Sequence, residues 1–353
     1  MRKSNLLYLL PALAILSCSK DEITPNTEEQ LVETKELSAN VEVAYPEDFG
    51  LISDVYFAGK KITVEEIDGD YIYEGDIIFS NDMITSKSVK LVYEKGEVPS
   101  PQKSVGRTSK RWPDNTVYYS IDSNLPDKNR ATEAIQHWQA NTSLKFVERT
   151  SQSNYIYFTS GSGCSSYVGM IGGRQNITLA SGCSTGNTIH EIGHAVGLWH
   201  EQSRVDRDKH IKINYSNIQS GREHNFKTYA ENGSDGDEFT SNLDFGSIML
   251  YSSYSFSNNG QPTIVKVDGS TYNVQRNALS AGDKTGISSM YPAGNTGGGT
   301  TEPVAPTYTN GEYYVISGLT VLRNNNSWWY YSRTYSMWRE VELRSNNRWY
   351  YVR

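Results

Sequence analysis

The sequence is poor in cysteine, lacks long apolar runs and has no block of basic residues. Its 353 residues include three cysteines, and no uninterrupted apolar stretch reaches the ~20 residues that a transmembrane helix requires. The 33 lysines and arginines are scattered and are outnumbered by 40 acidic residues, for a net charge of -7. This balance argues against a nucleic-acid partner. The odd number of cysteines means that one of them needs a role other than an internal disulfide.

The amino terminus has the features of an export signal. Arg2 and Lys3 precede an apolar stretch over residues 6–16, which predicts a signal peptide over residues 1–17. The next residue, Cys18, ends the run Ile-Leu-Ser-Cys, which resembles a bacterial lipobox, so a lipid anchor at Cys18 would be the only membrane attachment. The following Ser-Lys-Asp-Glu resembles the export tag of surface lipoproteins in Gram-negative bacteria. Plain secretion with an unmodified Cys18 stays open, and either route predicts an extracytoplasmic protein.

Composition divides the rest of the chain into segments. Residues 19–50 are polar and acidic, which indicates a solvated tether. Residues 95–110 combine prolines, serines and glycine with basic residues, and this mixture predicts an exposed linker that proteases can cut. A second linker, residues 293–307, contains the run Gly-Gly-Gly-Thr-Thr. The two linkers separate residues 106–292 from a tail over residues 308–353.

The hydrophobic pattern predicts short strands and one helix. Apolar residues at helical spacing predict a helix over residues 128–141. Alternating and β-branched segments predict strands over residues 61–65, 77–79, 116–121, 144–147, 155–158 and 176–180. The last of these strands, as an exposed edge, could pair with an extended peptide and so hold a protein substrate independently of its sequence.

Three histidines lie within eleven residues, after the last predicted strand. His190 and His194 are four residues apart, which places both imidazoles on one face of a helix. Gly197 allows the chain to leave that helix with a positive φ, so that His200 can return as a third nitrogen ligand. Three histidines with an open coordination position are typical of a catalytic zinc site. Glu191 could reach water in that position and act as a general base.

Cys164 and Cys183 flank the predicted strand over residues 176–180. In an exported protein, two cysteines in one short segment are expected to form a disulfide. The alternative is a second metal site, but no C-x-x-C motif or neighbouring histidine supports it. The disulfide would stabilise the fold by ~3 kcal/mol.

The tail contains an aromatic repeat. Residues 322–330, Leu-Arg-Asn-Asn-Asn-Ser-Trp-Trp-Tyr, are echoed 21 residues later by residues 343–351, Leu-Arg-Ser-Asn-Asn-Arg-Trp-Tyr-Tyr. Each copy predicts a strand, an asparagine-rich turn and an aromatic strand. Two interpretations stay open. The aromatic residues could fill the core of a very small β domain, or they could form a binding face for glycans or a cell surface.

The residues around the histidines resemble a known family. Residues 190–204, His-Glu-Ile-Gly-His-Ala-Val-Gly-Leu-Trp-His-Glu-Gln-Ser-Arg, are similar to the signature of the astacin metallopeptidases, a branch of the metzincins. Glu201, directly after the third histidine, marks that branch. Residues 247–251, Ser-Ile-Met-Leu-Tyr, resemble the Met-turn of the family, in which Met249 would be a hydrophobic floor beneath the metal.

The resemblance implies an α+β fold. A two-lobed metzincin catalytic domain would have a twisted mixed sheet and the zinc-binding helix in one lobe, with an irregular second lobe. The tail over residues 308–353 lies outside the resemblance, and its aromatic repeat predicts a small all-β domain. One Zn²⁺ would be held by His190, His194 and His200. Glu191 would be the general base, and Tyr251 a movable fourth ligand that swings off the metal to stabilise the oxyanion.

A second resemblance lies upstream of residue 106. Residues 73–77, Tyr-Glu-Gly-Asp-Ile, resemble the propeptide switch of the family, Phe-x-Gly-Asp, with tyrosine in place of phenylalanine. It implies that residues 18–105 hold the tether and propeptide and that Asp76 occupies the zinc in the zymogen. The mature amino terminus would fall between about residues 100 and 110 and dock near Glu201. Arg276 lies where relatives that prefer an acidic residue after the cut bond carry a basic one, and a guanidinium suits carboxylate recognition.

These observations predict a zinc-dependent endopeptidase that is made as a zymogen and cleaves extracellular proteins or peptides. The rival hypothesis is a surface adhesin or glycan-binding lipoprotein with an inactive protease fold. Glu191 argues against the rival, because an inactive site can lose its base at no structural cost.

Overall fold

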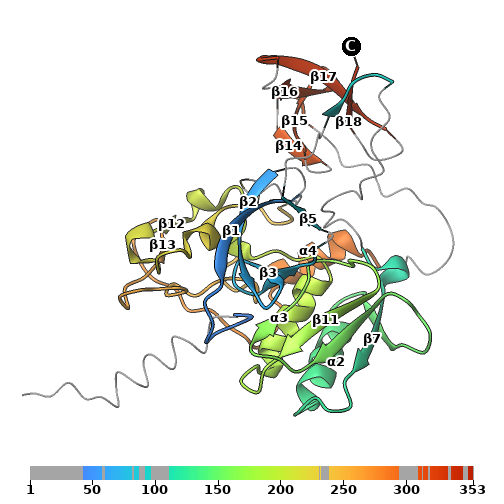
Figure 1. Ribbon diagram of the computed structural model, residues 1–353, viewed down its shortest axis with the longest axis vertical. Helices are drawn as coiled ribbons and strands as arrows, with labels where there is room; N and C mark the ends of the chain where they lie inside the picture. Colours follow the sequence, from blue (N-terminus) through green and yellow to red (C-terminus); the bar gives the residue numbers. More distant parts are fainter. Residues whose placement is uncertain are drawn as a thin grey trace, which may run out of the picture. The chain divides into compact units, whose positions relative to one another are not determined.

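The computed structural model (Figure 1) describes several stretches of the 353 residues. They are residues 43–57, 60–81, 83–86, 92–96, 111–229, 231, 238–293, 309–311, 313–316, 319–332, 335–344 and 349–352. The predicted signal peptide, Cys18, most of the tether and the predicted cleavage segment between residues 100 and 110 lie outside the described residues. Within the described part of the chain, no helix combines the length and hydropathy needed to cross a bilayer.

An antiparallel sheet precedes the central region; we call it the amino-terminal sheet. Its strand order is β4-β3-β2-β1-β5, and its strands are β1 (Leu51–Phe57), β2 (Lys60–Ile67), β3 (Asp70–Tyr73), β4 (Ile77–Phe79) and β5 (Ile84–Thr85). The hairpin between β2 and β3 turns on Asp68 and Gly69, which have φ of 53° and 85°. Two successive residues with positive φ favour a tight two-residue turn that matches the strand twist. The strands predicted over residues 61–65 and 77–79 both belong to this sheet.

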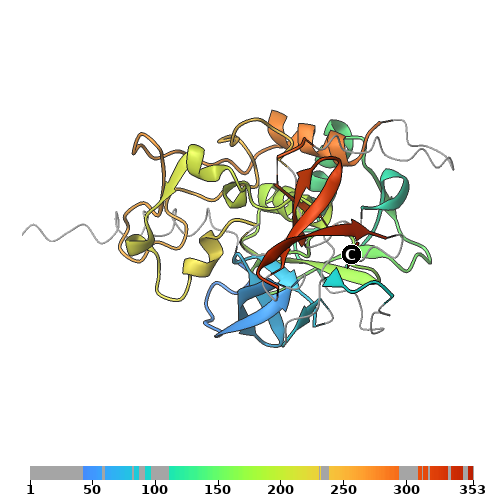
Figure 2. The same cartoon turned by 90° about the horizontal axis from the view of Figure 1, so that it is seen from above.

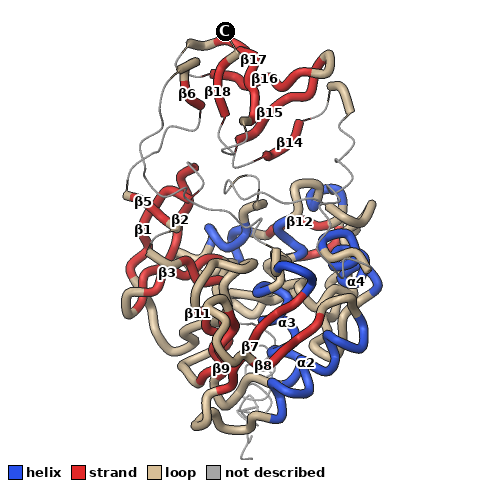
Figure 3. Tube along the Cα trace, turned by 90° about the vertical axis from the view of Figure 1, so that its right-hand side faces the viewer, coloured by secondary structure: helices blue, strands red, loops and turns tan. Residues whose placement is uncertain are grey.

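A mixed sheet forms the first half of the central region (Figure 3). Its order is β10-β11-β9-β7-β8, with β7 (Thr116–Ile121), β8 (Lys145–Glu148), β9 (Tyr155–Thr159), β10 (Cys164–Ser165) and β11 (Arg174–Leu179). Four strands run parallel, and β10 pairs antiparallel with the end of β11. The mixed sheet agrees with the expected fold class. The expectation that residues 176–180 form the edge strand is wrong, because β10 lies outside β11.

Two helices pack against this sheet, α2 (Asn129–Asn141) and α3 (Thr185–Ala195). Trp138 of α2 is fully buried, and its indole N–H donates to the Ile189 carbonyl of α3 over 3.0 Å. Ser184 caps α3: its hydroxyl accepts from the Asn187 backbone N–H, and the Asn187 side chain accepts from the Ser184 backbone N–H. This reciprocal cap satisfies donors that a helix start otherwise leaves unpaired. The start of α3 is therefore fixed by local sequence.

The second half of the central region is irregular. It contains the two-stranded sheet of β12 (Ile211–Ile213) and β13 (Ile264–Lys266) and the helix α4 (Ala281–Met290). Its apolar side chains, among them Phe226, Leu250 and Phe256, form a core separate from that of the mixed sheet. Single 3-10 turns make up much of the central region outside the sheets and long helices: η1 (Pro113–Asn115), η2 (Glu201–Ser203), η3 (Arg207–Lys209), η4 (Tyr215–Asn217) and η5 (Glu223–Phe226).

The tail forms a sheet of its own (Figure 2), which we call the tail sheet. Its strands are β14 (Tyr313–Ile316), β15 (Leu319–Asn324), β16 (Ser327–Ser332), β17 (Met337–Leu343) and β18 (Trp349–Tyr351). The first copy of the aromatic repeat falls on β15, a turn and β16, as its sequence predicts; the second falls on the end of β17 and on β18, and its predicted turn over residues 345–348 lies outside the described residues. A sixth strand, β6 (Val92–Tyr93), pairs in parallel with β18. The tail sheet therefore includes residues from before the central region, which the sequence pattern does not reveal.

A disulfide joins β10 to the segment before α3. The Cα atoms of Cys164 and Cys183 are 6.0 Å apart, and the sulfur atoms are bonded. This confirms the pairing expected from the two cysteines. The bond closes a loop of 19 residues in sequence that contains β11, and it ties this loop to the start of the helix that carries His190.

Candidate metal centre

The helix α3 presents two histidine rings, and the turn after it presents the third. The ring centroids of His190 and His194 are 4.8 Å apart, and His200 lies 4.7 Å from His194 and 5.4 Å from His190. Gly197 has a φ of 112°, a conformation that side chains with a Cβ rarely adopt. The chain therefore reverses at this residue and returns His200 to the face of α3. All three rings are at most 1% exposed.

The outer nitrogen of each ring is held by a hydrogen bond. Nδ1 of His190 bonds to the Ile248 carbonyl over 2.7 Å, and Nδ1 of His194 bonds to the Leu198 carbonyl over 2.8 Å. Nδ1 of His200 bonds to the Glu74 carboxylate over 2.8 Å. Such partners fix the tautomer and the orientation of histidines that bind metals. The three Nε2 atoms are left to face the same point.

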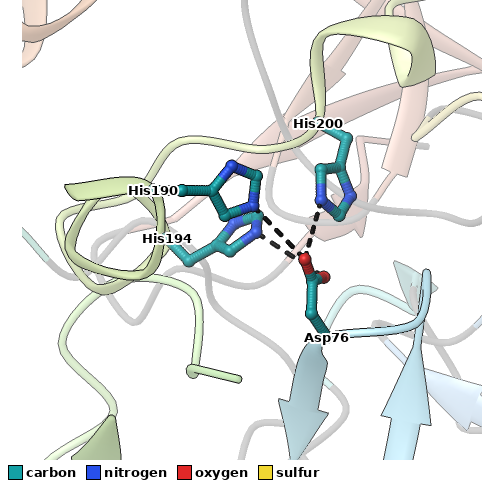
Figure 4. A group of neighbouring side chains, drawn as sticks. All are labelled: Asp76, His190, His194 and His200. Atoms are coloured by element: carbon teal, nitrogen blue, oxygen red, sulfur yellow. Dashed lines mark hydrogen bonds and ion pairs between the residues drawn. The ribbon is translucent and has the colours of Figure 1, made fainter. Parts of the chain in front are cut away.

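That point is occupied by one carboxylate (Figure 4). Nε2 of His190 and of His200 each lie 3.2 Å from Oδ2 of Asp76. Nε2 of His194 lies 3.7 Å from Oδ1 of the same group, and neither of these two buried atoms has a hydrogen-bond partner among the described residues. One ligand atom from each of the four residues lies within 4.8 Å of the others. Three imidazoles, which bind metals in their neutral form, and one carboxylate make a ligand set that suits a tetrahedral Zn²⁺. A bound ion would give the unpaired nitrogen and oxygen atoms a partner.

A tight turn between β3 and β4 carries Asp76 into the cluster. Glu74 and Gly75 have φ of 48° and 79°, and a side chain with a Cβ is disfavoured in this region unless other contacts hold it. For Glu74 those contacts are hydrogen bonds from His200 Nδ1 and from the Ser203 hydroxyl, each 2.8 Å long. Glu74 occupies the unspecified second position of the four-residue switch motif, so the motif by itself does not predict this role.

The charges of the cluster shift the pKa values of its members. Burial by itself would raise the pKa of Asp76, but the adjacent His200 and His194 hold it well below the usual range. Burial lowers the pKa of His194 to about 4, against the attraction of Asp76. For His200 burial also acts to lower the pKa, but Asp76 and Glu74 prevail and raise it to about 9. Asp76 is thus held as a carboxylate, the form that binds a cation.

The residues of the Met-turn pack directly beneath the histidines. Met249 is 1% exposed, and a Cβ added at Gly193 would lie 2.7 Å from its sulfur. The lack of a side chain at Gly193 therefore provides the space that the Met249 side chain occupies. The turn is anchored by α4, because Asp283 accepts from the Ser247 hydroxyl over 2.7 Å and from the Ile248 N–H over 3.0 Å.

Glu201 and Tyr251 lie beside the cluster. Glu201 is tied to the Met-turn, since its N–H donates to the Met249 carbonyl over 3.0 Å, and its carboxylate accepts from the Asp244 N–H over 2.8 Å. Burial raises the pKa of Glu201 to about 7. The ring of Tyr251 lies 4.6 Å from that of His200, and its hydroxyl donates to the Glu74 carbonyl. The tyrosine is thus engaged by the same turn that carries Asp76.

The turn is also held by backbone pairing with the segment that follows β10. The Ser166 N–H donates to the Asp76 carbonyl over 3.0 Å, and the Ile78 N–H donates to the Ser166 carbonyl over 2.8 Å. Farther along, the Cys164 N–H donates to the Val43 carbonyl over 3.1 Å. The outer edge of the mixed sheet therefore does hold an extended chain, but along residues 164–166 and not along β11.

Arg276 lies at the start of α3. Its guanidinium donates to the Leu250 carbonyl over 3.0 Å and to the Gln275 carbonyl over 2.9 Å. Its own carbonyl oxygen would lie 1.6 Å from a Cβ placed on Gly186. The backbone at Arg276 is therefore in close contact with the first turn of the histidine helix, and only glycine fits at position 186.

A buried ion pair ties the amino-terminal sheet to the second core. Arg222 bonds to the Glu65 carboxylate, with side chains only 8% and 3% exposed. The other carboxylate oxygen accepts from the Gly50 N–H over 2.8 Å. The two residues are 157 positions apart, so no local sequence pattern predicts this contact.

Removing one member of this pair should destabilise the protein strongly. We expect Glu65→Gln to lower the free energy of unfolding by ~3–5 kcal/mol, because it leaves the Arg222 charge buried without its partner. Urea unfolding of the full chain checks this. The double variant Glu65→Met with Arg222→Met, which removes both charges, should lose much less. Equal losses in the single and double variants would contradict this account of the pair.

Comparison with known proteins is consistent with this geometry. A family profile described as Astacin (Peptidase family M12A) matches residues 104–292. Blastula protease 10 of Paracentrotus lividus is 39% identical over 208 residues, which are 56% of this chain and 34% of that protein. Flavastacin of Elizabethkingia meningoseptica is 36% identical over 229 residues, which are 61% of this chain and 48% of that protein.

Two further comparisons concern a longer match and a solved structure. Zinc metalloproteinase nas-15 of Caenorhabditis elegans is 33% identical over 310 residues, 82% of this chain and 53% of that protein. The chain thus spans between 34% and 53% of the length of these three relatives. High choriolytic enzyme 1, a hatching enzyme zinc-protease from Oryzias latipes, is similar with a TM-score of 0.48 and 30% identity over 52% of this chain and 94% of that one. Since the family profile spans more than half of the 353 residues, this chain belongs to the astacin family of metallopeptidases.

Proposed function

We propose that this protein is the zymogen of a zinc-dependent endopeptidase that hydrolyses peptide bonds in extracellular proteins. One observation carries the proposal: the Nε2 atoms of three histidines all face the two oxygens of one buried carboxylate, that of Asp76. An adhesin with an inactive protease fold is disfavoured because the chain has Glu191. This residue lies in sequence between His190 and His194 on α3 and is fully buried.

The roles of the residues follow from their positions. His190, His194 and His200 would hold the zinc, which acts as a Lewis acid and makes water lose a proton near neutral pH. Glu191 would accept that proton and return it to the leaving amine. The phenol of Tyr251 would donate to the developing oxyanion, a task that a preorganised hydroxyl can perform.

Latency would come from the amino-terminal sheet. The carboxylate of Asp76 takes the place that a reacting water needs, and the Glu74 carbonyl accepts the hydroxyl proton of Tyr251. Residues 18–105 would then be the tether and propeptide, and residues 106–292 the catalytic domain. A cut between about residues 100 and 110 would allow the new amino terminus to dock near Glu201, whose partly buried carboxyl group could pair with an ammonium ion.

Location is proposed from the amino-terminal residues and the disulfide. Arg2, Lys3 and the apolar stretch after them support export, and the Cys164–Cys183 bond suits an oxidising compartment. The lipobox-like run ending at Cys18 supports a lipoprotein on the outer surface of a Gram-negative cell. Mass spectrometry of the mature protein would reveal diacylglycerol on Cys18, and an unmodified or absent Cys18 would contradict this point.

Activity should depend on the cut, on the metal and on Glu191. We expect the full chain to digest casein only after limited trypsin treatment, because Asp76 and Tyr251 must be released. Glu191→Gln should lower kcat by ~10²–10⁴-fold, the usual contribution of a general base, and should still bind one zinc by elemental analysis. A chelator should abolish activity in the wild type. Activity that survives both the chelator and Glu191→Gln would defeat the mechanism.

Arg276 is proposed to select an acidic residue after the cut bond. This role is supported by the position of the guanidinium beside the Met-turn, where it donates to the carbonyl oxygens of Leu250 and Gln275. In a peptide-library digest we expect Arg276→Ala to reduce the preference for aspartate or glutamate on the order of tenfold, the worth of one charged hydrogen bond. Arg276→Lys should keep part of it. An unchanged preference in Arg276→Ala would remove Arg276 from substrate selection.

The tail is proposed to carry a ligand face for glycans or a cell surface. Tyr331 is 44% and Trp338 is 39% exposed, and their rings meet edge to face across β16 and β17, 5.5 Å apart. Exposed aromatic pairs of this kind suit the apolar faces of sugar rings. We expect Trp338→Ala to weaken retention on a polysaccharide column, whereas Leu343→Ala, also exposed at 36%, should not. Equal retention of both variants would leave the aromatic pair without this role.

A further inference from the structure

The tail sheet ends on one side with a strand that lies far away in sequence. The strand β18, at the carboxyl end of the chain, pairs in parallel with β6, with Trp349 opposite Val92 and Tyr350 opposite Tyr93. The strand β6 lies before the segment in which the cut is expected, and β18 lies after the catalytic domain. The cut would therefore place these two paired strands on different polypeptides.

Burial shows that β6 is part of the tail core. Val92 is 5% exposed and packs in one apolar cluster with Val321, Val341 and Trp349 of the tail. Tyr93 is 9% exposed, and its ring lies 5.7 Å from that of Tyr350. Removing β6 would uncover this side of the cluster and the backbone edge of β18. An exposed edge of this kind tends to pair with another extended chain.

A charged contact follows directly after β6. Glu94 lies against Arg339 of β17, with Nη1 to Oε1 at 3.1 Å and Nη2 to Oε2 at 3.4 Å, and its Oε1 also accepts from the Tyr335 hydroxyl over 3.2 Å. The guanidinium lies 3.7 Å from the centroid of the Tyr351 ring. A planar guanidinium that faces both carboxylate oxygens recognises this group with fixed geometry. The geometry around Arg339 therefore suits an acidic residue at position 94.

We propose that the edge of β18, together with Arg339, is a binding site for an extended Val-Tyr-Glu segment, and that its occupant is residues 92–94 of the propeptide. The inference rests on the proposed zymogen function, because it concerns the state after the cut. The propeptide then stays attached through two separate contacts, the ligand cluster at Asp76 and the tail sheet at β6. Two linked contacts hold a cut segment far more tightly than either one alone, because each keeps the other at high effective concentration. The tail is thereby a second contact that holds the propeptide, and it slows release of the propeptide after the cut.

Hydrogen exchange of the full chain tests the site directly. The full chain with Glu191→Gln, which prevents self-digestion, serves as the parent. We expect Glu94→Gln and Arg339→Gln each to speed amide exchange in residues 92–94 and 349–352 on the order of tenfold, the loss expected when a charged hydrogen bond is removed. Arg323→Gln is the matched control, because Arg323 stacks on Trp328 and bonds to Asn326 within the same sheet. Exchange equal to the parent in Glu94→Gln and Arg339→Gln would overturn the proposal.

A charge exchange and a release assay separate recognition from folding. If Arg339→Gln only unfolds the tail, the double variant Glu94→Arg with Arg339→Glu should behave like the single variants. We expect it to restore slow exchange. After limited trypsin cleavage of the parent, the propeptide should elute with the rest of the chain on size exclusion and should separate faster in Arg339→Gln than in Arg323→Gln. Equal separation in the two variants would contradict retention by the tail. Neither readout uses activity, so the outcome is independent of the casein digest.

Discussion

The attraction between one buried carboxylate and three imidazoles determines how the parts of this protein meet. Asp76 lies within 3.7 Å of an Nε2 atom of each of the three histidines. Taking a carboxylate out of water is costly unless cations or donors surround it, so the turn that carries Asp76 is stable only against the histidine helix. The amino-terminal sheet must therefore dock on the central region, and Glu74, Glu65 and the pairing at Ser166 hold it there.

Local sequence predicted the parts of the site that depend on neighbouring residues. The spacing of His190 and His194, the turn at Gly197 and the return of His200 involve eleven residues of one helix and its end, so short-range rules suffice. The positions of the Met-turn and of Asp76 came from resemblance and not from periodicity. The roles assigned to Glu191, Tyr251 and Arg276, and the domain limits, remain predictions for experiment.

The contacts that were missed are those between distant segments. Arg222 and Glu65 are 157 residues apart, and neither belongs to a motif. The strands β6 and β10 each have two residues, too few for a period-two pattern to be visible. The wrong edge strand has the same origin: residues 176–180 have the stronger strand pattern, but the antiparallel pairing of β10 covers the end of that strand.

The contact between Gly186 and Arg276 has a consequence for how the loop at Arg276 could evolve in this chain. The carbonyl oxygen of Arg276 abuts the first turn of α3 so closely that a Cβ at residue 186 would be 1.6 Å away. This contact fixes the position of the Arg276 backbone along α3, the helix that carries His190. Changes in the length of the loops around it would alter what the guanidinium faces, but the contact at Gly186 would still hold the backbone of residue 276 against the start of α3. Divergence at this position should then proceed by exchanging the side chain at 276, while glycine persists at 186.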